Sequence, residues 1–354
     1  MEDALLTGRK PIEISLTGPA GRLGLALCLL FSVYYPLYSQ LRYQEKGYYP
    51  IENYDHESYK AHHQNWFITQ DRAGFVYSAN GQGVLEFDGA SWRLISAPGL
   101  SAVRTVVVDT DNVKWVGADR ELGYLEPDSL GFLQYISLKS LVPESDPLVG
   151  NIWQIFPEGN RILFVTDRLI YCWEDGAFRM IPTPGNIYRE YQIHGRVYFQ
   201  ITGKGMYELV GDSLELIPGG EDFRDRRAIT AMPYGDASVL FTTRESGMFV
   251  YDGNTIGKLE NEVEQYLFDN NYYANYRVND STYAFATLRG GVALMNGHGD
   301  WLGAITEDQG ILNNQVHCLA IDNENIPGYQ GCPCNCPISC LINGAASKEP
   351  FPPL

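Results

Sequence analysis

Short apolar segments, separated by polar residues and glycines, recur between Trp66 and Ile305 with a period of about 40 residues. Each repeat contains four such segments, and several alternate apolar and polar positions as half-buried β-strands do. We count six repeats. The segments lack the period of an amphipathic helix, so the pattern predicts an all-β protein built from four-stranded antiparallel units.

Two marks set the register of the repeats. A glycine opens the third segment at Gly83, Gly123, Gly205, Gly247 and Gly291, and Arg168 takes the corresponding place in the remaining repeat. An aromatic residue lies inside the second segment at Tyr77, Trp115, Phe164, Phe199, Phe241 and Phe285. Because both marks recur in the same order, they predict that the second and third strands of each repeat are neighbours.

Turn residues and apolar runs place the other two strands. The dipeptides Asp88-Gly89, Asp175-Gly176 and Asp252-Gly253 follow the third strand in three repeats. Asp-Gly suits the positive φ angles of a type I′ turn, so we expect tight hairpins leading into the fourth strand. Apolar runs at 66–69, 103–108, 152–156 and 229–232 are the predicted first strands.

Four strands per repeat at this period are typical of a β-propeller blade, and we assign residues 65–326 to such blades. An apolar run at 316–322 predicts the first strand of a seventh blade. Pro327 and Gly328 then stand where a second strand would begin, and a strand does not continue through them. The prediction is therefore six blades plus the start of a seventh, with the pattern interrupted by truncation or a frameshift of a longer gene. Residues 327–354 form an off-pattern Cys/Pro-rich tail that we expect to be disordered.

The N-terminal region predicts export. Arg22 precedes an apolar stretch at 23–38, which matches the hydrophobic region of a secretory signal peptide better than a membrane-spanning helix. We assign residues 1–39 to a signal peptide cleaved after Ser39 or to an uncleaved N-terminal anchor, and residues 40–64 to a lead-in segment. The long leader would also be explained by a start codon placed too early. Each alternative predicts a periplasmic or extracytoplasmic propeller.

The net charge and the positions of the cysteines restrict which partners, metals and cofactors we expect. The net charge of −17 argues against a nucleic-acid partner, because phosphate binding requires concentrated Lys and Arg. Cys172 and Cys318 lie in apolar segments and are expected to pack as small hydrophobic residues. Four further cysteines crowd the tail: Cys332, Cys334, Cys336 and Cys340. They could bind zinc or copper(I), but an exported tail would instead form disulfides, so we expect no metal and no cofactor.

The motif Asp-x-x-Asn/Gly-x-x-Trp/Tyr, followed by Gly-apolar-x-x-Tyr/Phe-Asp-Gly, recurs behind the lead-in residues 50–54 and 65–66. Over about residues 48–326 this arrangement resembles the two-component regulator propeller family of Bacteroidetes-type bacteria. The resemblance implies a ligand-binding sensor that is followed by a triple-tyrosine β-sandwich, a transmembrane helix and a kinase or DNA-binding output. Those downstream parts are missing from this sequence. They would belong to a longer parent, which could be a dimer and could use that helix as its membrane attachment.

Candidate ligand contacts lie in the loops between the second and third strands. These loops carry Arg120, Arg168, Lys204, Arg244 and Arg289. Cations around one mouth of a propeller would favour an anionic ligand such as an acidic oligosaccharide, although exposed loops carry charges for solubility as well. Tyr272, Tyr273 and Tyr276 form a second candidate for sugar stacking, with packing between blades as the alternative.

Motifs for catalysis are missing from the sequence. The six histidines are scattered without ligand spacing, and no nucleophile or metalloprotease motif appears. We therefore expect a sensor of a carbohydrate rather than an enzyme. The alternative is an exported propeller enzyme, such as a polysaccharide lyase or hydrolase, because the fold hosts both binding and catalysis.

Overall fold

The computed structural model describes residues 54, 56–143, 149–309, 311, 313–316 and 319. The chain divides into two units, Met1–Pro50 and Ile51–Leu354, and the described residues all belong to the second. The predicted signal peptide or anchor, the start of the lead-in segment and the Cys/Pro-rich tail lie outside the described residues. Among those described, no helix has the length and apolar character needed to cross a membrane.

The described part of the second unit contains six four-stranded antiparallel sheets, each a simple meander of consecutive strands. Blade 1 consists of β1 (Asn65–Gln70), β2 (Val76–Asn80), β3 (Gly83–Phe87) and β4 (Trp92–Ile95). Blade 2 consists of β5 (Val103–Val108), β6 (Lys114–Ala118), β7 (Glu121–Pro127) and β8 (Leu133–Ser137). Blade 3 consists of β9 (Gln154–Glu158), β10 (Arg161–Val165), β11 (Leu169–Glu174) and β12 (Ala177–Pro182).

The second half of the described chain repeats the same arrangement. Blade 4 consists of β13 (Ile187–Ile193), β14 (Arg196–Ile201), β15 (Gly205–Val210) and β16 (Ser213–Leu216). Blade 5 consists of β17 (Ala228–Tyr234), β18 (Ser238–Thr243), β19 (Met248–Tyr251) and β20 (Ile256–Leu259). Blade 6 consists of β21 (Tyr272–Asn279), β22 (Thr282–Thr287), β23 (Val292–Asn296) and β24 (Trp301–Ile305).

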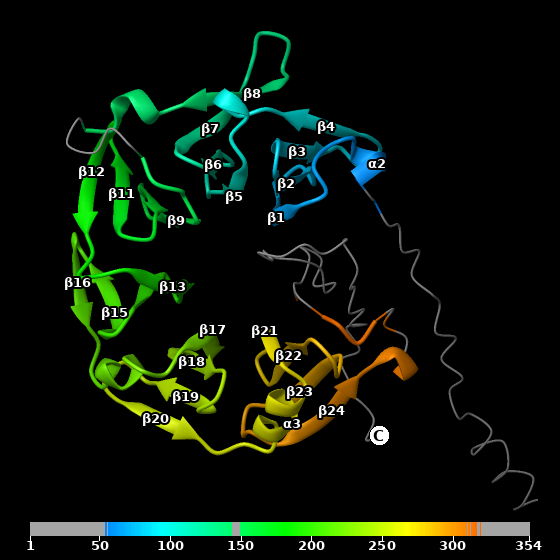
Figure 1. The fold of residues 1–354 in the computed structure, drawn as a ribbon, viewed down its shortest axis with the longest axis vertical. Helices are drawn as coiled ribbons and strands as arrows, with labels where there is room; N and C mark the ends of the chain where they lie inside the picture. The colour runs from blue at the N-terminus through cyan, green and yellow to red at the C-terminus, as the bar shows by residue number, and fades with distance from the viewer. Residues whose placement is uncertain are drawn as a thin grey trace, which may run out of the picture. The chain divides into compact units, whose positions relative to one another are not determined.

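Helical structure among these residues is limited to short connections. They are α2 (His56–Tyr59), α3 (Glu264–Asp269), and the single 3₁₀ turns η1 (Pro98–Leu100), η2 (Lys139–Leu141), η3 (Gly220–Phe223) and η4 (Glu307–Gln309). In Figure 1 the six sheets follow one another around a common centre, with the first strand of each sheet innermost and the fourth outermost. This arrangement confirms the predicted β-propeller with six recognisable blades.

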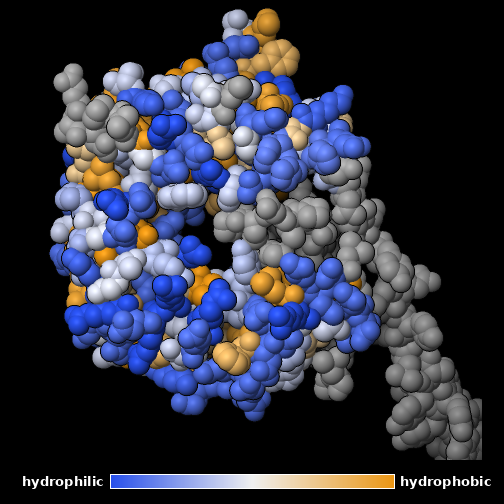
Figure 2. Space-filling view, viewed as in Figure 1, coloured by the Kyte–Doolittle hydropathy of each residue, from blue (hydrophilic) through white to orange (hydrophobic). Residues whose placement is uncertain are grey.

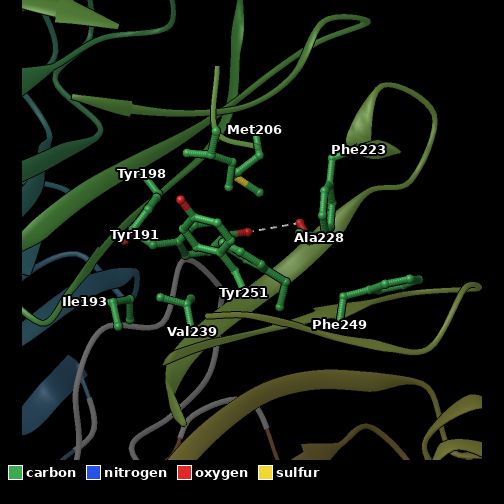
Figure 3. Close-up of a cluster of buried hydrophobic side chains, with 11 residues drawn as sticks. Tyr191, Ile193, Tyr198, Met206, Phe223, Ala228, Val239, Phe249 and Tyr251 are labelled. Carbon is green, nitrogen blue, oxygen red and sulfur yellow. Dashed lines mark hydrogen bonds between the residues drawn. The ribbon is translucent and has the colours of Figure 1, made fainter. Parts of the chain in front are cut away.

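Blades are held together by apolar faces that pack on one another. The predicted aromatic positions of the second strands are all buried, with Phe164, Phe199, Phe241 and Phe285 at 0% exposure. Phe241 lies in the cluster between blades 4 and 5, together with Tyr191 and Tyr198. Figure 3 shows that cluster, in which the Tyr191 hydroxyl donates a hydrogen bond of 3.0 Å to the carbonyl oxygen of Ala228. This hydrogen bond therefore joins blade 4 to blade 5 within their shared core.

The recurring glycine opens the third strand because the neighbouring backbone comes too close for a side chain. At Gly205 the backbone has φ +116°, and a Cβ atom would collide with the carbonyl oxygen of Gly220. Gly83 has φ +152°, and its Cβ would collide with the carbonyl oxygen of Ile95. Both features exclude ordinary side chains at these positions. These glycines therefore mark the place where the chain leaving the fourth strand passes close to the start of the third strand.

The Asp of the repeated motif fixes the turn between the first and second strands. Asp109 Oδ1 accepts the backbone N–H groups of Asp111 and Val113, and its Oδ2 accepts Trp115 Nε1–H at 2.7 Å. Asn112, the fourth residue of the motif, has φ +66°, which explains the Asn/Gly preference there. Asp71 makes the same kind of turn in blade 1. Its carboxylate also forms a buried ion pair of 2.9 Å with Lys114 Nζ of blade 2.

The type I′ prediction is correct at one of the three Asp-Gly dipeptides. Asp175 and Gly176 both have positive φ and form a two-residue loop between β11 and β12. It is wrong at Asp88-Gly89 and Asp252-Gly253, where four residues separate the paired strands and only the glycine has positive φ. There the aspartate carboxylate accepts backbone N–H groups across the turn. The side chain stabilises a longer loop, which the dipeptide alone does not distinguish from a tight one.

The far face of blade 6 packs against residues that follow it. Ile311, Val316 and Leu319 form a buried cluster with the apolar side chains of β22 and β23. The Val316 N–H donates to the Thr287 carbonyl at 2.8 Å, as the Ile187 N–H donates to the Asp167 carbonyl at the start of blade 4. Residues that follow blade 6 therefore cover its far face, and the start of a seventh blade stays a prediction. Cys318 and residues 320–326 lie outside the described residues.

Candidate ligand-binding site

The five predicted cations occupy loops between the second and third strands. These loops are β6–β7 for Arg120, β10–β11 for Arg168, β14–β15 for Lys204, β18–β19 for Arg244 and β22–β23 for Arg289. All five residues are exposed. Their predicted loop positions are confirmed, whereas their contact with a ligand stays a prediction.

Few protein groups compete for these cations. Arg168 Nε lies 4.0 Å from Asp167 Oδ2, and Lys204 Nζ donates to the Pro184 carbonyl at 2.6 Å. Within the described residues, the side chains of Arg120, Arg244 and Arg289 have no hydrogen-bond or ion-pair partner.

The three tyrosines of the predicted cluster lie in different environments in the structure. Tyr272 is 5% exposed, packs in the core between blades 5 and 6, and shares a hydrogen bond with the Thr230 hydroxyl. Burial raises the pKa of its hydroxyl. Tyr276 packs on the other face of blade 6, and burial raises its pKa as well. The positions of Tyr272 and Tyr276 favour the packing alternative, and Tyr273, which is partly buried, is left as the candidate for stacking.

A feature that the sequence analysis missed is a β-bulge near the start of the first strand. Five blades carry it, and the extra residues, at which the strand register shifts, are Trp66, Arg104, Tyr188, Ile229 and Tyr273. In blade 3, Trp153 holds the corresponding place directly before the pair Gln154–Val165. A bulge re-aims a side chain away from the regular alternation of faces. We call these six residues the bulge ring.

The bulge ring and the cation loops lie at the same edge of the blades. Val103, the first residue of β5, pairs with Ala118, the last residue of β6, so the start of β5 adjoins the loop of Arg120. In blade 5 the Arg244 N–H donates to the carbonyl of Arg227, which directly precedes β17. The first strands are innermost in Figure 1, and Figure 2 shows a hollow at the centre of the sheets. The bulge ring is thus the inner, and the cation loops the outer, part of one surface.

The guanidinium group of Arg104 makes several contacts at this surface. Its Nε and Nη2 donate to the two carboxylate oxygens of Asp119 at 2.9 and 3.0 Å. Its guanidinium carbon lies 4.3 Å from the ring centroid of Trp66 and 5.4 Å from that of Trp153. Because Trp66 belongs to blade 1 and Trp153 precedes the first strand of blade 3, Arg104 connects three neighbouring blades.

A second pairing of arginine with an aromatic ring lies at blades 4 and 5. The guanidinium carbons of Arg189 and Arg227 lie 5.3 and 5.4 Å from the centroid of Tyr188. Next to Arg189, Glu190 is partly buried in β13, and no hydrogen bond or ion pair joins its carboxyl group to the described residues. Burial raises its pKa to about 7, although the nearby Arg189 favours the charged form.

The described residues contain no group of three or more side chains suited to hold a metal ion. Cys172 is a buried free thiol in the core between blades 3 and 4, as expected, and burial raises its pKa. The four tail cysteines lie outside the described residues.

The chain matches no protein-family model and no curated protein. Its structure is similar to that of YCF48 bound to D1 peptide, with a TM-score of 0.60, 12% identity, and coverage of 81% of this chain and 95% of YCF48. It is also similar to the extracellular domain of the putative one component system BT4673 from B. thetaiotaomicron (TM-score 0.57, 15% identity, 80% of this chain). The similarity is one of fold.

Two further facts bear on what these comparisons imply. The match to BT4673 covers 39% of that extracellular domain, so this chain spans less than half of its length. Streptogramin B lyase also shares the fold, with a TM-score of 0.51, 13% identity, and coverage of 76% of this chain and 91% of the lyase. The same architecture therefore occurs in a signalling protein and in an enzyme, and the site must decide between them.

Proposed function

We propose that this chain is the extracytoplasmic sensor propeller of a signal-transduction protein and that it binds an anionic oligosaccharide. The observation that carries the proposal is the set of five exposed cations at one edge of the blades, in a protein whose net charge is −17. Cations gathered on an otherwise acidic protein attract carboxylate or sulfate groups through charge-assisted hydrogen bonds. The shared fold with the extracellular domain of a putative one component system is consistent with this role.

The remaining parts of the proposal concern the whole protein. The apolar stretch at 23–38 supports export as a cleaved signal peptide or as an anchor. Output would be delivered by a longer parent, attached to the membrane and able to dimerise. The acidic surface of this portion supports a partner other than nucleic acid.

The test is binding of the full chain to a panel of uronic-acid and sulfated oligosaccharides, measured by titration calorimetry. We expect the double variant Arg244→Ala/Arg289→Ala to bind more weakly by roughly tenfold or more, because each removes a charge-assisted contact. Arg179→Ala, which removes an exposed arginine of the outermost strand β12, is the matched control and should bind as the unaltered chain does. Unchanged binding of the double variant to every anionic glycan would contradict the role of the cation loops.

One observation favours an enzyme as the second candidate. Glu190 has a pKa of about 7 on an innermost strand, which suits general acid or base chemistry, and a lyase shares the fold. Incubation with uronate-containing polysaccharides would reveal unsaturated or reducing products if the chain were a polysaccharide lyase or hydrolase. Products that form with the unaltered chain and not with Glu190→Gln would favour this candidate over a sensor.

A further inference from the structure

We infer that Arg104, together with the neighbouring rings of Trp66 and Trp153 in the bulge ring, forms a subsite for one uronic-acid residue of the bound oligosaccharide. The inference rests on the proposed function and assigns the sugar-contacting side chains to residues that are separate from the loop cations. It starts from the five bulges and the matching position of Trp153, which place one residue near the start of the innermost strand at the same edge of each blade.

The guanidinium of Arg104 is preorganised for a carboxylate. Asp119 accepts hydrogen bonds from Nε and from one hydrogen of Nη2, and the indole rings of Trp66 and Trp153 lie 4.3 and 5.4 Å from the guanidinium carbon. Three N–H bonds remain, two on Nη1 and one on Nη2, and none of them has a hydrogen-bond partner among the described residues. Their fork matches the two oxygens of a carboxylate, and little rotamer entropy is left to lose on binding.

Trp153 supplies the contact for the body of the sugar. It is 44% exposed although it is a large aromatic residue, and its ring centroid lies 5.4 Å from the guanidinium carbon of Arg104. An indole face packs well against the C–H face of a pyranose, with the adjacent cation taking the acidic group. A neutral sugar would lack the partner for Arg104, and an acidic peptide would not need the flat face. The pair therefore favours a uronic acid.

A second site of similar chemistry extends the interaction. Arg227 and Tyr188 place another exposed guanidinium over an aromatic residue of the bulge ring, on blades 4 and 5. A chain of uronic acids could use both sites, which would raise its affinity above that of a single unit. We therefore expect longer oligosaccharides to bind more tightly than the monosaccharide.

The experiment titrates the full chain with oligogalacturonates of increasing length and with their carboxyl-reduced, neutral counterparts. We expect Trp153→Ala to weaken oligogalacturonate binding by roughly three- to tenfold and Trp153→Tyr to restore most of it. Arg104→Lys keeps the charge but loses the fork, so a loss of roughly tenfold or more is expected. Phe268→Ala, which removes a 59% exposed aromatic residue outside the ring, is the control for the loss of an exposed ring. Thermal melting of each variant separates loss of binding from loss of fold.

The outcomes distinguish this inference from the proposed function. If the unaltered chain binds oligogalacturonates and the Trp153 and Arg104 variants bind equally well while remaining folded, the subsite is wrong and the sensor proposal stands. Equal affinity for the neutral counterparts would also overturn the subsite, because Arg104 would then have no role. Tight, Trp153-dependent binding of an acidic peptide with no binding of oligogalacturonates would replace the sugar by a peptide. If no anionic glycan binds at all, both proposals fail.

Discussion

Glu190 carries the clearest pH dependence at the scale of single residues. Burial raises its pKa from the ordinary value of 4.5 to about 7, and the nearby Arg189 only partly opposes this. Between these two values the folded protein binds the proton more tightly than the unfolded chain. The stabilisation is therefore fully present below pH 4.5 and is lost as the pH rises through about 7. We compare the free energy of unfolding of Glu190→Gln with that of the unaltered protein. This difference should favour the variant by about 1–3 kcal/mol more at pH 8 than at pH 4.

The measurement is chemical denaturation of both proteins at several pH values. Glu215→Gln is the matched control, because Glu215 lies exposed on the outermost strand of the same blade. Its effect should not depend on pH. A stability difference between Glu190→Gln and the unaltered protein that is constant from pH 4 to pH 8 would show that Glu190 titrates normally.

The turns of the repeated motif belong to the scale of the elements. Asp109 satisfies two backbone N–H groups and the indole N–H of Trp115, so it holds β5 and β6 at their connection. Asp109→Ala would leave the indole N–H of the buried Trp115 without its acceptor and the turn without its carboxylate. We expect a loss of about 2–4 kcal/mol in the free energy of unfolding, measured by denaturant titration.

Asp88→Ala is the comparison for this prediction. Asp88 also accepts two backbone N–H groups, but it does so in an exposed loop where water replaces the lost carboxylate. Its replacement should therefore cost clearly less stability than the replacement of Asp109. Equal losses at Asp88 and Asp109 would mean that the bond to Trp115 adds nothing to the stability of the blade.

At the scale of the whole molecule, each blade is stable only when its apolar faces are covered. The far face of blade 6 is covered by Ile311, Val316 and Leu319, and Val316 is 0% exposed. Val316→Asp would bury a carboxylate in this cluster. We expect it to lower the stability of blade 6 by about 3 kcal/mol or more and to speed hydrogen exchange of the β22 and β23 amides.

The matched control places the same charge on the exposed side of the same blade. Leu302 in β24 is 42% exposed, so Leu302→Asp should change stability little. Slow exchange of β22 and β23 in Val316→Asp would show that the residues after blade 6 do not contribute to its stability. It would also remove the support for Val316 as part of a further blade.

The repeat, the strand order and the loop positions of the cations could be predicted because they depend on local rules. Apolar alternation reports the pleat of a strand, and the glycines at 83, 123, 205 and 291 report a close approach of a backbone carbonyl, whereas a Cβ at Gly247 would meet the Glu264 side chain. Turn length was harder, since Asp-Gly occurs both in the tight loop at Asp175 and in the longer loop at Asp88. The dipeptide records the preference of one residue pair, whereas the loop length depends on where strand pairing ends.

Sequence alone was sufficient for the architecture of this protein, because each blade repeats the same short-range pattern of apolar strands, aspartate turns and glycines. The residues of the inner surface, by contrast, could be identified only from the tertiary structure. A bulge is a shift between two paired strands, so Trp66, Arg104 and Trp153 look like ordinary strand or loop residues until their partners are known. Their contacts join three different blades. Such a site arises only when separate repeats meet at the centre, because no local pattern records which side chains face one another there.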